Sequence, residues 1–207
     1  MVEDDNSTEG EMPEMTYCLA GDILPEKESL EMLPGKTLVI GPSRAGKSYF
    51  SEAFKAAGLH VVDTDKDTDL IKWRNDFTGE QVEKPRDVDD EWLAANHFVI
   101  KAEELEQFLA TQGNVIMFAN CWNIMDVIGQ FDRVAYMSLT PDEVERRLQI
   151  ERADHDEVGT PAELEFFRQR HRERSEQAKQ KRITLIDATL PPTEFYNELS
   201  QVGSNDW

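Results

Sequence analysis

The stretch KTLVIGPSRAGKS at residues 36–48 decides the fold of this 207-residue chain. Its first part, residues 36–40, is an apolar run with the length and composition of a buried strand. Residues 41–48 then fit the pattern G-x-x-x-x-G-K-[ST], and the following residues are typical of a helix that ends at Gly58. Such a glycine-rich turn lets successive backbone amides point at an anion beside the helix N-terminus. The stretch therefore predicts a phosphate-binding loop.

The residue types in this Walker A loop indicate how a nucleoside triphosphate would be held. Lys47 would reach the β- and γ-phosphates of ATP, and the Ser48 hydroxyl would bind Mg²⁺. The alternative is a tight turn that happens to contain Lys-Ser, and the flanking strand and helix argue against it. The expected nucleotide contacts are Gly41, Ser43, Arg44, Ala45, Gly46, Lys47, Ser48, Tyr49 and, near the C-terminus, Thr189.

Length and composition fit one domain with a sizeable core. Two cysteines, Cys18 and Cys121, cannot form a disulfide framework, so a reducing compartment is expected. The sequence contains neither an apolar run near the roughly 20 residues that span a bilayer nor an apolar signal segment. We therefore expect a cytoplasmic protein without a membrane partner, and the sequence does not indicate its oligomeric state.

The formal net charge is −20, and residues 1–31 carry ten acidic side chains against the single base Lys27. A field of that sign repels nucleic acid at long range. Solubility is the simplest explanation, with a salt-adapted host or an interaction tail as alternatives.

After the loop, apolar runs alternate with helical stretches. Strands are expected at residues 36–40, 59–63, 114–119, 133–139 and 183–187, and helices at 48–57, 101–111, 141–152, 161–181 and 192–201. Near-continuous apolar strands separated by helices predict a parallel sheet that is covered on both faces. We predict an α/β fold, the three-layer sandwich of P-loop NTPases, with five parallel strands and ligands at their carboxyl ends.

From about residue 35 to residue 202 the chain resembles P-loop kinases of the nucleoside-monophosphate-kinase and shikimate-kinase branch, and within it little-characterised, kinase-like ATP-binding proteins of phage type. Asp63-Thr64-Asp65 is similar to the D-x-D by which shikimate kinases hold Mg²⁺ and an acceptor hydroxyl. Arg146 and Arg147 lead to Arg152 and to a segment that looks like a compact lid. Residues 183–191 resemble the segment that frames adenine, and residues 118–121 lack a Walker B aspartate, as is usual for this branch.

The resemblance implies a division of the chain. Residues 1–14 would be a disordered acidic tail and residues 15–34 an N-terminal extension. Residues 35–203 would form the kinase domain, with an acceptor-binding insert at about 66–100 and a short lid at about 152–161.

The resemblance also implies catalytic roles. Lys47, Mg²⁺ on Ser48, and a lid arginine would neutralise the transferred group, with Arg152 the first choice and Arg147 the second. The alternative for both arginines is a solvated helix face that pairs with Glu145 and Glu151.

The two aspartates of the D-x-D would share the acceptor side. Asp63 would orient Mg²⁺ or take the acceptor proton, and Asp65 would grip the acceptor. A simple turn between strand and helix is the alternative for Asp63-Thr64-Asp65.

The insert matches no nucleoside-monophosphate or shikimate pocket, so the acceptor stays open. Its expected contacts are Asp65, Trp73, Arg74, Arg86, Asn120 and Trp122, although core packing is the more common fate of a tryptophan. His97 is expected to be structural, and Cys121 has no base partner that would make it a nucleophile.

The predicted function is transfer of the ATP γ-phosphate to a hydroxyl or phosphate of a small molecule, such as a nucleotide or nucleoside. One alternative is a kinase of polynucleotide ends or of 5-hydroxymethyluracil within DNA. The basic stripe at residues 168–182 would suit a nucleic-acid partner, but its interleaved glutamates suit a solvated helix and the net charge disfavours it. The other alternative is a non-catalytic ATP sensor.

Overall fold

The computed structural model describes residues 32–85, 87–154 and 161–204. The predicted acidic tail, most of the N-terminal extension, Arg86 and the middle of the predicted lid lie outside these residues. Five parallel strands form the main sheet in the order β2-β5-β1-β6-β7. Their bounds are β1 Lys36–Ile40, β2 Val61–Asp63, β5 Val115–Ala119, β6 Arg133–Ser138 and β7 Thr184–Asp187. The predicted five-stranded parallel sheet is confirmed.

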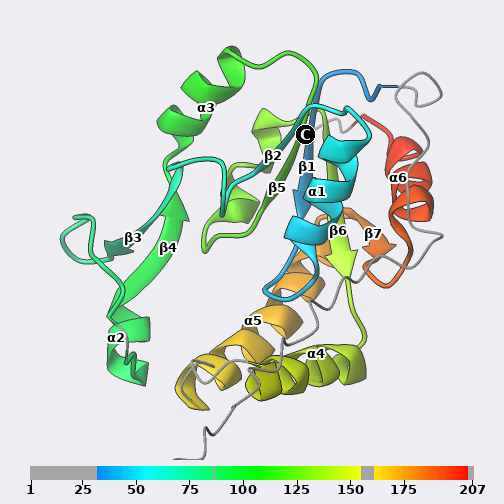
Figure 1. The fold of residues 1–207 in the computed structure, drawn as a ribbon. Helices are drawn as coiled ribbons and strands as arrows, with labels where there is room; N and C mark the ends of the chain where they lie inside the picture. Colours follow the sequence, from blue (N-terminus) through cyan, green and yellow to red (C-terminus); the bar gives the residue numbers. More distant parts are fainter. Residues whose placement is uncertain (1–31, 86, 155–160, 205–207) are drawn as a thin grey trace, which may run out of the picture.

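Helices cover both faces of this sheet (Figure 1). The side chains of β1 alternate between two cores: Leu38 packs in a cluster that includes Leu105 of α3, whereas Val39 packs with Phe54 of α1 and Phe195 of α6. The helices are α1 Lys47–Ala56, α3 Ala102–Ala110, α4 Pro141–Asp154, α5 Pro161–Gln180 and α6 Pro192–Ser200, with 3₁₀ turns at Ile124–Asp126 and Ile128–Gln130. The predicted elements are all present, and their ends differ by a residue or two.

The predicted insert contains a structure that the sequence did not reveal. Strands β3 Ile71–Asn75 and β4 Asn96–Ile100 pair antiparallel, and the short helix α2 Asp90–Ala95 leads into β4. The hairpin and α2 extend away from the main sheet in Figure 1. Polar and apolar residues are mixed in both strands, so neither shows the continuous apolar pattern of the main sheet.

The order of the strands places the ligand-binding edge. The chain runs from central β1 to the edge strand β2, later forms β5 between them, and then crosses to β6 on the other side of β1. Ligands of open α/β sheets bind at the carboxyl ends where the order reverses. The loop after β1, the turn after β2 and the residues after β5 therefore meet at one edge. Within the described residues, each helix is too short or too polar to cross a membrane.

Candidate active site

The loop after β1 has the backbone geometry of an anion cradle. Arg44 and Gly46 both have positive φ angles, 68° and 93°, and Gly46 is the N-cap of α1. The Ala45 amide donates to the Pro42 carbonyl, and the Gly41 amide donates to the Ala119 carbonyl at the end of β5. This curled loop therefore opens directly onto the N-terminus of α1, where amides and helix dipole favour an anion.

Gly41 is required by close packing. A Cβ at this position would lie 2.5 Å from Lys47 Cγ and 2.7 Å from Met137 Sδ. The aliphatic part of Lys47 therefore passes directly over the glycine backbone, and Lys47 is only 9% exposed.

Two aspartates hold the two side chains that the motif assigns to phosphate and metal. Lys47 Nζ lies 3.3 Å from Asp65 Oδ2. The Ser48 hydroxyl donates to Asp63 Oδ2 at 2.8 Å, and Asp63 is fully buried. Asp63 Oδ1 also accepts from the Asp65 amide at 3.1 Å, which is the hydrogen bond of an Asx turn. The Asp63 carboxylate therefore stabilises the turn after β2 and contacts the phosphate loop at the same time.

The Lys47–Asp65 pair lies where two hollows meet. The loop hollow has a volume of about 460 Å³ and is lined by Ser43, Arg44, Gly46, Lys47, Ser48, Tyr49, Asp65, Arg147 and Phe167. The aromatic cavity has a volume of about 310 Å³ and shares Ser43, Lys47, Asp65 and Phe167 with the loop hollow. Its other walls are Pro42, Trp73, Lys84, His97, Phe98, Asn120, Cys121, Trp122, Phe166, Arg170, His171 and Arg174.

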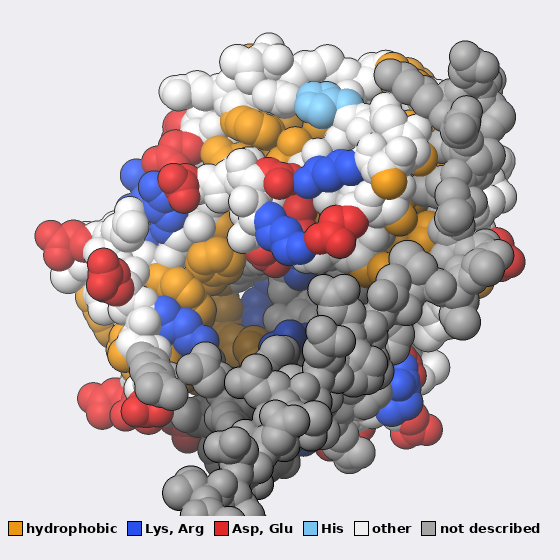
Figure 2. Space-filling model, viewed as in Figure 1, with side chains coloured by type: hydrophobic (Ala, Val, Ile, Leu, Met, Phe, Trp, Pro, Cys, Tyr) orange, Lys and Arg blue, Asp and Glu red, His pale blue; other side chains and the backbone are white. Residues whose placement is uncertain are grey.

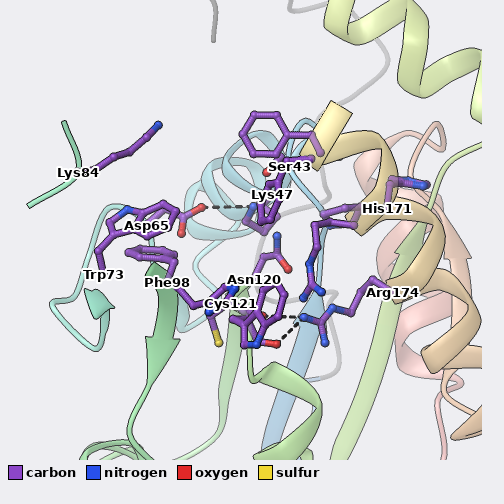
Figure 3. A pocket seen from close by; sticks show the side chains of 16 residues that line it. Ser43, Lys47, Asp65, Trp73, Lys84, Phe98, Asn120, Cys121, His171 and Arg174 are labelled. Carbon is purple, nitrogen blue, oxygen red and sulfur yellow. Dashed lines mark hydrogen bonds and ion pairs between the residues drawn. The ribbon is translucent and has the colours of Figure 1, made fainter. Parts of the chain in front are cut away.

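Aromatic rings from the hairpin and from the segment after β5 form much of this cavity (Figure 3). The Trp73 ring contacts Phe98 across the hairpin, with centroids 5.5 Å apart. The Trp122 ring has His97 stacked at 3.5 Å and the Arg170 guanidinium carbon at 3.8 Å from its centroid. Two groups so close to one centroid would overlap on the same face, so they sandwich the indole. Trp122 is nevertheless 39% exposed.

Helix α5 divides its basic residues between solvent and cavity. Arg168, Arg172 and Lys179 pair with neighbouring glutamates. In contrast, Arg170 and Arg174 line the aromatic cavity. The predicted basic stripe is therefore not one continuous surface.

Arg174 fixes the segment after β5. It is 4% exposed and donates to the carbonyls of Cys121 and Trp122 at 3.0 and 2.7 Å, and to the Gln177 side chain at 3.0 Å. Burial, and then the nearby Arg170 charge, lower the pKa of Arg174 to about 10. The side chain still carries its charge at neutral pH.

Cys121 is placed at the cavity, but its chemistry is that of a buried thiol. Burial raises the pKa of Cys121 to about 12, so the thiolate is not formed at neutral pH. This agrees with the sequence interpretation that Cys121 is not a nucleophile.

Arg147, the second predicted arginine, braces the phosphate loop. Its guanidinium donates to the carbonyls of Arg44 and Ala188 at 3.0 and 3.1 Å, and it pairs with Glu143 at 2.6 Å. The side chain of Glu151, one of the two predicted partners, lies outside the described part of the molecule. It also lines the loop hollow. The side chain of Arg152, the first choice, lies outside the described part of the molecule.

Two of the predicted contacts that line neither hollow have hydrogen-bond partners in their own segments. Arg74 donates to the Gly79 carbonyl within the hairpin and lines neither hollow. Thr189 donates through its amide and its hydroxyl to Asp187, and it too lines neither. Their roles in binding stay predictions, as does that of Arg86, which lies outside the described residues. Trp73, Asn120 and Trp122 do line the aromatic cavity.

Sequence reasoning missed the contribution of α5 and β4 to the cavity. Phe166, Arg170 and Arg174 are spaced by four residues, which places them on one side of a helix. This spacing, together with an aromatic residue among charged ones, is the sequence feature that could have predicted a cavity-lining face on α5. His97 and Phe98 could be found only with the hairpin, since it brings β4 to the phosphate loop.

Comparisons with known proteins add the following. No protein-family model matches the sequence, and neither does any curated protein. Among solved structures, a gluconokinase from Sinorhizobium meliloti 1021 is similar over 82% of this chain and 91% of its own, with 18% identity and a TM-score of 0.48. A shikimate kinase from Bacteroides thetaiotaomicron is similar over 82% and 95%, with 14% identity and a TM-score of 0.45. A deoxyadenosine kinase from M. mycoides, solved with bound dATP, is similar over 79% and 96%, with 13% identity and a TM-score of 0.41.

The architecture of the chain itself defines its fold class. A central strand leads through a glycine-rich G-x-x-x-x-G-K-S loop into a helix, within a parallel sheet covered on both faces. This is the three-layer α/β sandwich of P-loop NTPases, as the sequence predicted.

Proposed function

We propose that this protein is an ATP-dependent phosphotransferase that acts on a small molecule bound in the aromatic cavity. The observation that carries the proposal is the position of Lys47 and Asp65 on the boundary shared by the two hollows. A phosphoryl group passed from one hollow to the other would cross this boundary. Phosphoryl transfer depends mainly on positioning and on neutralising charge, which is what residues at such a boundary can supply.

The loop side fits a magnesium-bound triphosphate. Carboxylate oxygens already contact Lys47 and Ser48, so both side chains are oriented toward anionic oxygen. Ser48 and Asp63 would supply oxygen ligands to Mg²⁺, directly or through water, beside phosphate oxygens and water. When bound, Mg²⁺ would neutralise charge on the phosphate oxygens.

The residues at and near the boundary would then have different roles in phosphoryl transfer. Lys47 would leave Asp65 and neutralise the β- and γ-phosphate oxygens. Asp65, freed from the lysine, would accept a hydrogen bond from the acceptor hydroxyl. Asp63 would keep the Ser48 hydroxyl oriented, and Arg147 would hold the loop through the Arg44 carbonyl.

A small acceptor is supported by the form of the cavity. At about 310 Å³, its volume lies at the lower end of the range for small-molecule sites. Two arginines of the basic stripe, Arg170 and Arg174, line this cavity and contact the segment after β5 instead of forming an outer surface for a polymer. The presence of a formed cavity beside the phosphate loop also favours an enzyme over a nucleotide sensor.

The test is a screen of ATP consumption over nucleosides, nucleotides, sugars, organic acids and hydroxyl-bearing DNA. Each hit is confirmed by mass spectrometry of the phosphorylated product and repeated with Lys47→Ala, which removes the charge that neutralises the phosphates. We expect at least one small acceptor whose phosphorylation is lost in Lys47→Ala. Normal turnover in that variant would refute the assignment of the phosphate loop, and transfer to DNA alone would favour the polymer kinase.

A further inference from the structure

The aromatic cavity is cationic although the protein is strongly acidic. Among the residues that line it, Lys47, Lys84, Arg170 and Arg174 are basic, whereas Asp65 is the one carboxylate. Figure 2 shows a hollow on this face, with Lys or Arg side chains in it and hydrophobic side chains beside it. The whole chain has a formal net charge of −20, so this local excess of positive charge runs against the overall field.

Within the described part of the chain, Arg174 of α5 is not neutralised by an ion pair, as a buried arginine usually is. Arg174 is 4% exposed, and its hydrogen bonds go to two backbone carbonyls and one glutamine, all neutral. Within the described residues, no carboxylate lies within ion-pair distance of it. Arg170 has one acidic partner, Glu173, at 3.1 Å. A buried charge without an opposite charge is costly, so this arrangement needs a reason.

The guanidinium of Arg174 has donors left for a ligand. It carries five N–H groups, and the three hydrogen bonds above use three of them. The guanidinium carbon of Arg170 lies 3.8 Å from the centroid of the Trp122 ring, and its hydrogen bond to Glu173 uses one N–H group, which leaves other N–H groups for a ligand. Planar arginine edges bind carboxylate and phosphate groups better than any neutral group, because the hydrogen bonds are charge-assisted.

We propose that the acceptor carries an anionic group, a carboxylate or a phosphate, and that Arg170 and Arg174 bind this group at the end of the cavity formed by α5 and the segment after β5. This inference rests on the proposed function, because it takes the cavity as the acceptor site. It narrows the acceptor class: the substrate has a hydroxyl or phosphate that meets Asp65 and a separate anion that meets the arginines. A neutral sugar or an uncharged nucleoside would leave Arg174 with neutral hydrogen-bond partners alone.

The test uses small aromatic probes that need no phosphoryl transfer. Benzoate, phenyl phosphate and the neutral benzamide are titrated by calorimetry and tryptophan fluorescence, with and without a saturating non-hydrolysable ATP analogue and Mg²⁺. The analogue covers the phosphate loop, so probe binding that persists belongs to the cavity. We expect at least one anion to bind about tenfold or more tightly than benzamide, as charge-assisted hydrogen bonds require. The comparison of benzoate with phenyl phosphate identifies which anion the site prefers.

Glutamine variants at two positions of α5, Arg170 and Arg172, give the matched control. Arg170→Gln should lower the affinity for the anion to that for benzamide, and Arg170→Lys should retain part of it. Arg172→Gln should have no effect, because Arg172 is exposed and pairs with Glu165 outside the cavity. Thermal melting checks that each variant is folded.

Several outcomes would overturn the inference: equal binding of benzoate and benzamide, no anion binding at millimolar concentrations, the same loss in both glutamine variants, or anion binding that only Lys47→Ala removes. Failure of the proposed function is seen separately, as absence of Lys47-dependent phosphoryl transfer. Anion binding that depends on Arg170 would survive that failure.

Discussion

At Gly41 the backbone and the side chain of Lys47 occupy adjoining space, with no room for a methyl group between them. Replacing Gly41 with Ala should displace Lys47 or the loop and weaken binding of ATP by roughly tenfold or more, at a stability cost of about 1–3 kcal/mol. Calorimetric titration with ATP·Mg²⁺ and thermal melting measure the two effects. Gly113→Ala is the control, because a Cβ there meets no atom within 4 Å. Equal ATP affinity in the two variants would contradict the packing argument.

Asp65 competes with phosphate for Lys47, since the two side chains pair at 3.3 Å. Asp65→Asn should therefore raise the affinity for ATP measured without acceptor, while it raises the acceptor KM. Asp63→Asn should instead lower kcat by roughly 10²-fold, because it removes the charge that faces Ser48 and Mg²⁺. Steady-state kinetics and nucleotide titrations separate the two. If both variants changed ATP affinity, acceptor KM and kcat by small and equal amounts, Asp63-Thr64-Asp65 would be only a turn.

Among the elements, α4 contacts the phosphate loop through Arg147, and Glu143 of the same helix holds Arg147. Hydrogen bonds from Arg146 and then Arg147 lower the pKa of Glu143 to about 2. A carboxyl whose pKa is lowered on folding stabilises the folded protein fully at pH values above its pKa in the unfolded chain, which is 4.5 for Glu143. This stabilisation is lost as the pH falls toward the folded pKa of about 2. Glu143 also fixes Arg147, which donates to the Arg44 carbonyl.

Glu143→Gln should therefore lower the melting temperature at pH 7, and the difference from the wild type should shrink as the pH approaches 2 to 3. Melting curves across this range provide the measurement. Glu198→Gln on α6 is the comparison, as Glu198 is exposed and forms no ion pair with any residue in the described ranges. A deficit for Glu143→Gln that is constant with pH would show that its ion pairs do not contribute.

The elements also show what a sequence can and cannot predict. Strand β1, the loop and α1 were predictable because an apolar run, spaced glycines and a helix are all local signals. The β3–β4 hairpin was not, because its pairing of Trp73 with Phe98 joins mixed polar segments that are far apart in sequence. The cavity residues of α5 were missed for a related reason: the same run of arginines and glutamates fits a solvated helix, and only packing against Trp122 distinguishes Arg170 from Arg172.

On the scale of the whole molecule, a net charge of −20 surrounds a cavity whose lining is basic. Long-range repulsion would slow the approach of an anionic acceptor, but a small anion is screened at physiological ionic strength, where the Debye length is about 8 Å. A polyanion meets the repulsion along its whole length, and the arginines that could hold it are paired with glutamates or lie in the cavity.

Binding of labelled single- and double-stranded DNA should accordingly be weak even at low salt, and turnover of the small acceptor should depend little on ionic strength once ATP·Mg²⁺ is saturating. A nucleic-acid substrate would behave differently: its affinity would fall with salt by a slope of roughly 0.9 per phosphate contact. Charge reversal at Arg170 and Arg174 distinguishes the two substrate classes further, because it should weaken binding of the small anionic acceptor at every salt concentration. Tight, salt-sensitive DNA binding that both reversals abolish would make the polymer the substrate and the cavity a site for a single flipped base.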